Sequence, residues 1–261
     1  MTHLVIGRVL QTPTPTTLET DRVAIAVDDT GTITEVVPAG GDRERELRHL
    51  ATSVTEADAG TYLLPGLVDL HVHAPQWPQL GTGLDLPLEE WLFAHTFPLE
   101  ARYRDLAFAA RVWDDLVSTL VRHGTTTAVY FATNDVAATS ALAEAAARQG
   151  QRAFVGRVAM DHPEGTPEWY RDDSATAGVD ASARSIDEID RIDAGRGLIR
   201  PIITPRFTPA CTDTLLAGLG ELAEATGVLV QTHCSESNWA HGAALERYGI
   251  TDTAALDRFG L

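Results

Sequence analysis

The 261-residue chain is 44% hydrophobic and carries a formal net charge of −17. A chain of this length and apolar content can bury a sizeable core, so we expect a globular protein of one or two domains. All 20 basic residues are arginine. The acidic surface repels nucleic acid and anionic membranes, and neither is expected as a partner.

Cysteine content and the N-terminal sequence indicate the compartment. Cys211 and Cys234 form neither a disulfide framework nor a paired zinc motif, which favours a reducing environment. The first apolar run is too short for a signal peptide, and no window reaches the length of a membrane span. We therefore expect a cytoplasmic protein.

Residues 1–61 are predicted to form a small β domain, an incomplete β-sandwich. Its strands are short β-type segments separated by turn residues, at 3–10, 22–27 and 33–37. Residues 41–48, "GDRERELR", have the composition of a polar connector. The pattern changes at about residue 62, where a second domain is predicted to begin.

Residues 62–261 alternate apolar strands with helical repeats. Five strands rich in β-branched residues are predicted, at 63–73, 125–133, 151–161, 198–207 and 228–236. Helical spacing occurs at 106–124, 136–150 and 212–227. The alternation predicts an α/β fold, a (β/α)8 TIM-like barrel, with a doubly wound open sheet as the alternative. Because a closed barrel needs eight strands, we expect a partial barrel of about five βα units, the front part of a longer enzyme.

Two histidines end the first barrel strand. Side chains alternate faces along a strand, so His71 and His73 project to the same side, at the end where barrel enzymes carry their chemistry. His233 ends the fifth strand in the same way. An isolated His-x-His pair more often reflects packing, but three imidazoles at one rim suit zinc. We predict one zinc ion per chain.

An acidic residue follows the third histidine. Glu236 lies three residues beyond His233, within reach of a metal-bound water whose proton it could take and pass to substrate. The alternatives are a solvated surface glutamate or a helix cap. Beside a metal ligand, a catalytic role is the better hypothesis.

An ordered series of segments carries a family resemblance. "PGLVDLHVHAPQ" is followed by "LDLPLEEWLFAHTFPLE", "YFAT", "QRAFVGRVAMD", "TPRFTP" and "THCSES". Over residues 62 to about 240 this series resembles the guanine deaminases of the amidohydrolase superfamily. The resemblance implies a zinc-dependent hydrolase that converts guanine to xanthine and ammonia, and that commonly pairs as a homodimer.

The resemblance also implies roles for single residues. The three histidines would ligate zinc, and Glu236 would shuttle the proton. Gln76 would contact the purine edge through its amide, Arg206 would donate to the carbonyl side, and Phe207 would form an apolar wall. His233 and Glu236 would contact substrate as well. The ordinary alternatives are a surface ion pair for Arg206 and simple core packing for Phe207.

Other residues near the motifs are expected to shape or support the site. Trp77, Trp91 and Phe97 would shape a lid or pocket wall, or pack in the long first loop, and Asp69 would support the first strand. In the family, a histidine on the sixth strand and an aspartate on the eighth complete the site. Both lie beyond the predicted strands, so this chain is expected to have very weak activity or none.

Rival functions stay open. An aminohydrolase for cytosine, an adenosine derivative or a triazine would share the metal site, although Gln76 with Arg206 favours guanine. Dihydroorotase-like or hydantoinase-like enzymes bridge two metals with a carbamylated lysine, which a chain without lysine cannot supply. An inactive, truncated remnant is the non-enzyme alternative.

Overall fold

The computed structural model describes residues 2–261, which form two compact units. The first unit ends at Gly66, and the second runs from Leu67 to Leu261. Among the described residues no helix combines the length and the apolar character needed to cross a lipid bilayer.

The first unit is a five-stranded sheet with one helix. Its strands are β1 (His3–Val9), β4 (Arg22–Val27), β5 (Ile33–Pro38), β6 (Ser53–Glu56) and β7 (Tyr62–Leu63). β1 lies between antiparallel β4 and parallel β6, β5 extends the sheet beyond β4, and β7 pairs with the end of β1. A separate hairpin joins β2 (Gln11–Thr14) to β3 (Thr17–Glu19). Alternate residues of β1 and β4 form its core.

The predicted connector at 41–48 is wrong, because Asp42–Leu50 form helix α1. Oppositely charged side chains one turn apart pair along this helix, as Arg48 does with Glu44 at 2.5 Å. Leu47 packs into the core of the unit. The polar composition of this segment therefore belongs to a solvated helix face.

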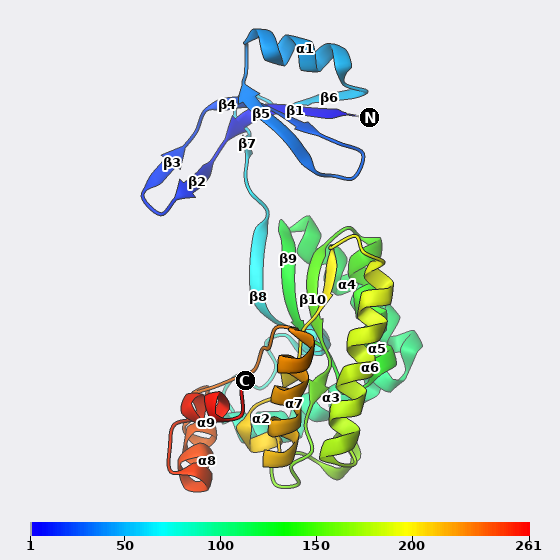
Figure 1. Cartoon of the computed structure of the whole chain (residues 1–261), viewed down its shortest axis with the longest axis vertical. Coiled ribbons are helices and arrows are strands. Elements are labelled where there is room, and N and C mark those ends of the chain that lie inside the picture. Colours follow the sequence, from blue (N-terminus) through cyan, green and yellow to red (C-terminus); the bar gives the residue numbers. More distant parts are fainter. Residues whose placement is uncertain (1) are drawn as a thin grey trace. The chain divides into compact units, whose positions relative to one another are not determined.

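The second unit is built on parallel strands in the order expected of a barrel. Its strands are β8 (Leu67–His73), β9 (Thr125–Phe131), β10 (Arg152–Gly156), β11 (Val158–Ala159), β12 (Ile199–Pro201) and β13 (Thr204–Pro205). β8, β9, β10 and β12 pair in sequence, and β11 pairs with β13. Figure 1 shows long helices packed beside this sheet: α4 (Leu106–Arg122), α5 (Val136–Arg148), α6 (Ala175–Asp193) and α7 (Asp213–Thr226). This arrangement confirms the predicted α/β partial barrel, and α6 adds to the predicted helices.

The predicted fifth strand exists only as two isolated bridges. Val230 pairs with Ile203, and His233 pairs with Phe207, both in parallel. Two backbone hydrogen bonds of 2.9 Å flank the first bridge. Because the neighbouring β13 is two residues long, a continuous ladder does not form. The segment nevertheless holds the place in the sheet that the sequence predicts for it.

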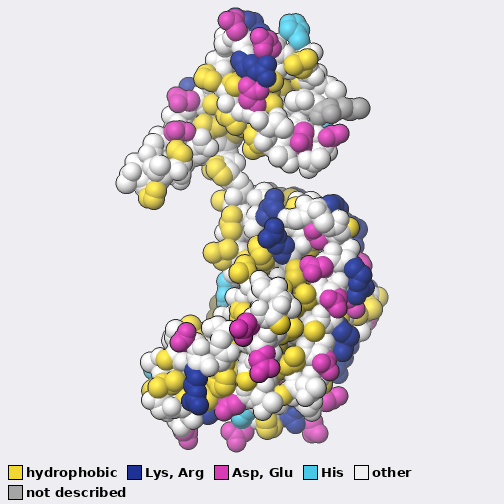
Figure 2. All heavy atoms as spheres, viewed as in Figure 1, with side chains coloured by type: hydrophobic (Ala, Val, Ile, Leu, Met, Phe, Trp, Pro, Cys, Tyr) yellow, Lys and Arg dark blue, Asp and Glu magenta, His cyan; other side chains and the backbone are white. Residues whose placement is uncertain are grey.

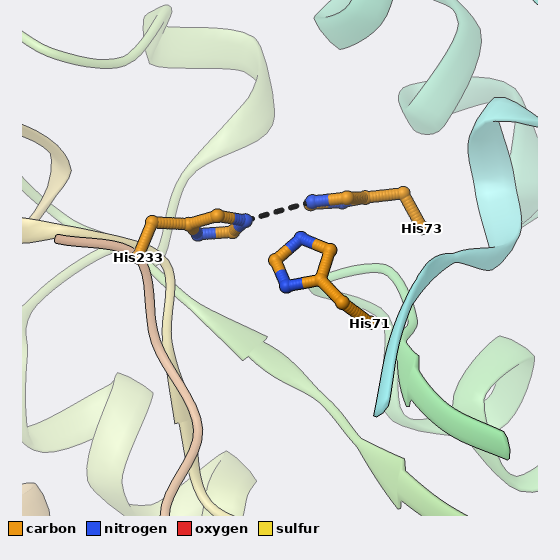
Figure 3. A group of neighbouring side chains, drawn as sticks. All are labelled: His71, His73 and His233. Carbon is orange, nitrogen blue, oxygen red and sulfur yellow. Dashed lines mark hydrogen bonds between the residues drawn. The ribbon is translucent and has the colours of Figure 1, made fainter. Parts of the chain in front are cut away.

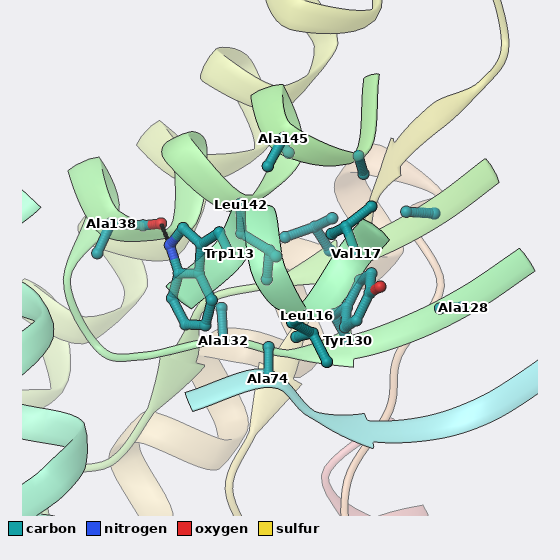
Figure 4. Packing of buried hydrophobic residues seen from close by; sticks show 14 of the residues in the cluster. Ala74, Trp113, Leu116, Val117, Ala128, Tyr130, Ala132, Ala138, Leu142 and Ala145 are labelled. Atoms are coloured by element: carbon teal, nitrogen blue, oxygen red, sulfur yellow. Dashed lines mark hydrogen bonds between the residues drawn. The ribbon is translucent and has the colours of Figure 1, made fainter. Parts of the chain in front are cut away.

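The main core fills the space between the sheet and helices α4 and α5 (Figure 4). Trp113 of α4 is fully buried, and its indole N–H donates to the Ala138 carbonyl at 3.0 Å. The inner face of α5 is mostly alanine, which lets this helix lie close to β10. The packed core holds the strands rigid, so their carboxyl ends form a fixed platform for side chains.

Short helices occupy the loops that leave these carboxyl ends. The first loop holds η1 (Ala74–Gln79), α2 (Leu88–Trp91), the π-helix η2 (Leu92–Thr96), α3 (Phe97–Ala101) and η3 (Arg102–Arg104). Later segments hold η4 (Glu168–Tyr170), η5 (Thr208–Ala210), α8 (Asn238–Tyr248) and α9 (Asp252–Arg258). Most are too short to leave a periodic signal in the sequence, and none was predicted.

Candidate functional site

The three predicted histidines meet at one point. His71 and His73 lie at the end of β8, and His233 lies at the bridge beside Phe207. One ring nitrogen from each lies within 4.8 Å of the other two. Figure 3 shows the rings turned toward a common centre. His73 Nε2 and His233 Nε2 are 2.8 Å apart.

Neighbouring groups fix how these rings are oriented. His233 Nδ1 donates to the Arg206 backbone carbonyl at 2.6 Å, which leaves its Nε2 free of hydrogen in the neutral ring. A histidine that ligates a metal commonly holds its other nitrogen in this way. Phe131, at the end of β9, packs against all three rings with centroids 4.5 to 4.7 Å away. His233 is therefore oriented by its hydrogen bond to Arg206, and Phe131 forms a shared packing surface for all three rings.

The surroundings also keep two of the rings neutral. Burial lowers the pKa of His73 well below its ordinary value, and the nearby His233, Arg206 and His71 add to the effect. Burial likewise lowers the pKa of His233 to about 4, against the opposing hydrogen bond from its ring to the Arg206 carbonyl. Metal ligation requires the neutral imidazole, so the residues present fit a divalent ion.

One cavity of about 160 Å³ joins these histidines to the other predicted site residues. The predicted residues on its wall are His71, His73, Gln76, Arg206, Phe207, His233 and Glu236. Pockets for drug-sized ligands are larger, about 300 Å³ or more. The volume here suits a small heterocycle.

Glu236 forms part of the wall of this cavity. Its side chain is exposed on one side, yet burial of the other side raises the carboxyl pKa, against the opposing charges of Arg206 and His71. The preceding Ser235 adopts a left-handed backbone, with φ of 55°, and its hydroxyl donates to buried Asp252 at 3.0 Å. The loop that presents Glu236 is thus anchored from α9.

Arg206 is buried, and the alternative of a surface ion pair is wrong. Its terminal nitrogens donate to the two carboxylate oxygens of Glu100, at 2.6 and 3.1 Å. Burial opposes the positive charge, but Glu100 more than compensates and raises the pKa of Arg206. Phe207 is also buried, with its ring centroid 5.5 Å from that of Trp239 and 6.5 Å from that of His233.

The three aromatic residues of the first loop, Trp77, Trp91 and Phe97, lie in different surroundings. Trp91 lines the cavity, together with Leu88 and Leu92, which the sequence did not single out. The Phe97 ring lies under the Arg206 guanidinium, 4.9 Å from its carbon. Trp77 instead packs toward the core and donates to Asp115 of α4 at 2.7 Å.

Asp69 lies within β8 as expected. Its carboxylate accepts the backbone N–H of His71 at 3.1 Å. This contact supports the strand beside His71, and Asp69 does not line the cavity.

Comparison with known proteins gives the family. Residues 62–260 match the amidohydrolase family. The chain belongs to that family. This amidohydrolase chain is 44% identical over 181 residues to a guanine deaminase of Dictyostelium discoideum, a match that covers 67% of the chain and 38% of that protein. It is 35% identical over 215 residues to human guanine deaminase, covering 82% of the chain and 46% of that protein. The chain thus spans less than half the length of these relatives.

Solved structures agree with this assignment. Guanine deaminase from C. acetobutylicum, solved with bound guanine, superposes with a TM-score of 0.88 at 27% identity, covering 100% of this amidohydrolase chain and 60% of the other. An adenosine deaminase from Xanthomonas campestris with bound zinc has a TM-score of 0.81 at 25% identity, covering 99% and 55%. A triazine hydrolase variant, at 20% identity and a TM-score of 0.79, shows the shared fold.

Proposed function

We propose that the site hydrolyses guanine to xanthine and ammonia with the help of one zinc ion. The observation that carries this proposal is a single small cavity whose wall holds three histidines, a carboxylate, an amide and an arginine. The similarity to guanine deaminases, one of them solved with guanine bound, supports the same substrate.

The metal would be held by His71, His73 and His233. Zinc bound there would supply a Lewis acid that activates water at neutral pH. Glu236 would take a proton from the attacking water and give it to a ring nitrogen of the purine. It would then take the proton of the new hydroxyl group and give it to the amino group, which leaves as ammonia while the carbonyl forms. Burial raises the pKa of Glu236, which favours a group that accepts a proton and then gives it up again.

The rest of the wall would orient the purine. Arg206 would donate to the carbonyl oxygen, and Gln76 can donate and accept through one amide along the same edge. Phe207 would give the flat ring an apolar surface. These contacts would hold the amino-bearing carbon beside the histidines, where the reaction occurs.

The test is product formation by the purified 261-residue chain after loading with zinc. We expect one zinc per chain and zinc-dependent formation of xanthine and ammonia, even at a low rate. Parallel assays with adenosine, cytosine and an aminotriazine test the rival aminohydrolase functions. A zinc-loaded, folded chain that neither binds guanine nor converts it would overturn the proposal.

A further inference from the structure

One acidic residue at the site has no role in the proposed reaction. Glu100, on α3 of the first loop, is 1% exposed, which is unusual for a glutamate. Its carboxylate contacts Arg206 on one side and the side-chain nitrogen of Gln76, at 3.4 Å, on the other. A residue outside the cavity wall thus touches two of the groups that would bind the purine.

The chemistry of Glu100 determines how those two groups are presented. An ionised carboxylate only accepts hydrogen bonds, so it holds the amino end of the Gln76 amide toward itself and the carbonyl end away. It takes one N–H from each terminal nitrogen of Arg206, and the guanidinium has five N–H groups in all. The other N–H groups of Arg206 can therefore donate to a further acceptor, such as a carbonyl oxygen of the substrate.

The first loop is shaped to deliver this residue. The π-helix η2 runs directly into α3, and such local widening is frequent at functional sites. Phe97 and Glu100 lie three residues apart on α3, so they share one helix face. Both are buried, and both contact the Arg206 guanidinium, one through its ring and the other through its carboxylate.

We propose that Glu100 is a positioning residue that fixes the Arg206 guanidinium and the Gln76 amide in the orientations that bind the purine edge. It also neutralises the buried arginine, so the pair offers directed donors with little net charge. A neutral heterocycle with a carbonyl group is then favoured over an anionic ligand. This inference rests on the proposed function, and it assigns the selectivity of the site for a neutral ligand to Glu100.

The first test is structural and needs no substrate. Glu100→Gln keeps the shape of the side chain but removes the charge and one of the two accepting oxygens. We expect crystal structures of this variant to show Arg206 or Gln76 displaced or in more than one conformation, with the three histidines unmoved. Arginine and glutamine side chains that keep their original orientations would overturn the proposal.

The second buried ion pair supplies a matched control. Arg157 and Asp172 are both buried, as Arg206 and Glu100 are, and neither lines the cavity. Asp172 also accepts the Met160 backbone N–H, which the amide oxygen of an asparagine can still do. Asp172→Asn therefore reproduces the loss of a buried carboxylate, and we expect it to leave guanine affinity within twofold.

Kinetics and guanine binding then separate positioning from stability. Glu100→Gln should raise KM and the guanine dissociation constant about ten- to a hundredfold with zinc content unchanged, because misplaced binding groups cost that much. A purely structural role would lower the active fraction, and so the apparent kcat, at constant KM. That result would overturn the proposal.

If Glu100→Gln folds poorly, a double variant still tests the proposal. Glu100→Gln combined with Arg206→Gln leaves no unpaired buried charge. Because the contact to Arg206 is already lost, the double variant should bind guanine more tightly than the product of the two single losses predicts, and any loss beyond that of Arg206→Gln alone comes through Gln76. Independent, multiplying losses would contradict the inference. A wild-type chain that binds no guanine would instead overturn the proposed function, and the crystal structures would still decide the role of Glu100.

Discussion

The residues at the site acquire their chemistry from neighbours distant in sequence. His233 is oriented by a carbonyl 27 residues away, and Arg206 by a carboxylate 106 residues away. The histidines and Glu236 could be predicted, because strand alternation and position at a strand end leave a local signal. Glu100 could not, because a glutamate in a loop is ordinarily solvated and only the fold buries it.

Replacement of Glu236 tests its proposed role in proton transfer. We expect Glu236→Gln to lower kcat by about 10²- to 10⁴-fold with zinc still bound, the usual contribution of a general base. In the wild-type chain the base must be ionised, so kcat/KM falls as pH drops through the Glu236 pKa. Since burial raises that pKa, the fall should lie above the ordinary glutamate value of about 4.3.

The measurement is the pH profile of kcat/KM for the wild-type chain and for Glu236→Gln, with the zinc content checked at each pH. The residual activity of Glu236→Gln should lack this acidic limb. A variant with wild-type kcat would rule out proton transfer by this side chain.

At the level of elements, the helices with strong periodicity were predicted closely. α4, α5 and α7 begin and end within two residues of the predicted ranges. Strands were predicted in the right places but too long: 151–161 breaks at Arg157 into β10 and β11. Apolar composition shows where a chain is buried, whereas the length of a ladder depends on the register of its neighbours.

Two glycines within helices should respond oppositely to substitution. A Cβ on Gly220 of α7 would lie 1.9 Å from the Phe259 carbonyl oxygen, whereas a Cβ on Gly242 of α8 would meet nothing within 4 Å. Gly220→Ala should therefore destabilise the fold by about 1–3 kcal/mol through overpacking. Gly242→Ala should stabilise it by up to about 1 kcal/mol, the difference in helix propensity.

Urea unfolding of both variants beside the wild-type chain measures this difference. Equal shifts in the free energy of unfolding would show that the end of α9 does not pack on α7 as the structure has it.

At the scale of the whole molecule, one edge of the sheet is apolar and unpaired among the described residues. β8 ends the strand order, and three of its apolar side chains are exposed: Leu67, Val68 and Leu70. Figure 2 shows hydrophobic side chains at the surface where Figure 1 draws β8. Exposed apolar edges favour association, and proteins often protect them with lysine, which this chain lacks. The predicted homodimer stays a prediction.

Self-association through this edge should weaken when a charge is placed on it. Leu70 is 70% exposed, and Leu70→Lys should lower the apparent mass in light scattering. The matched control is Leu84→Lys, because Leu84 is 81% exposed but lies in the first loop and belongs to no strand. Association of the wild-type chain should rise with salt, which screens its net charge of −17. Equal effects of the two substitutions would argue against this edge.

We expect three imidazoles from the two ends of the partial barrel to bind one ion. A crystal structure of the chain soaked in zinc, with anomalous scattering recorded at the zinc edge, tests it most directly. We expect one peak about 2.0–2.1 Å from a ring nitrogen of each of His71, His73 and His233. A peak that lacks any one of these ligands, or no peak between them, would contradict the account.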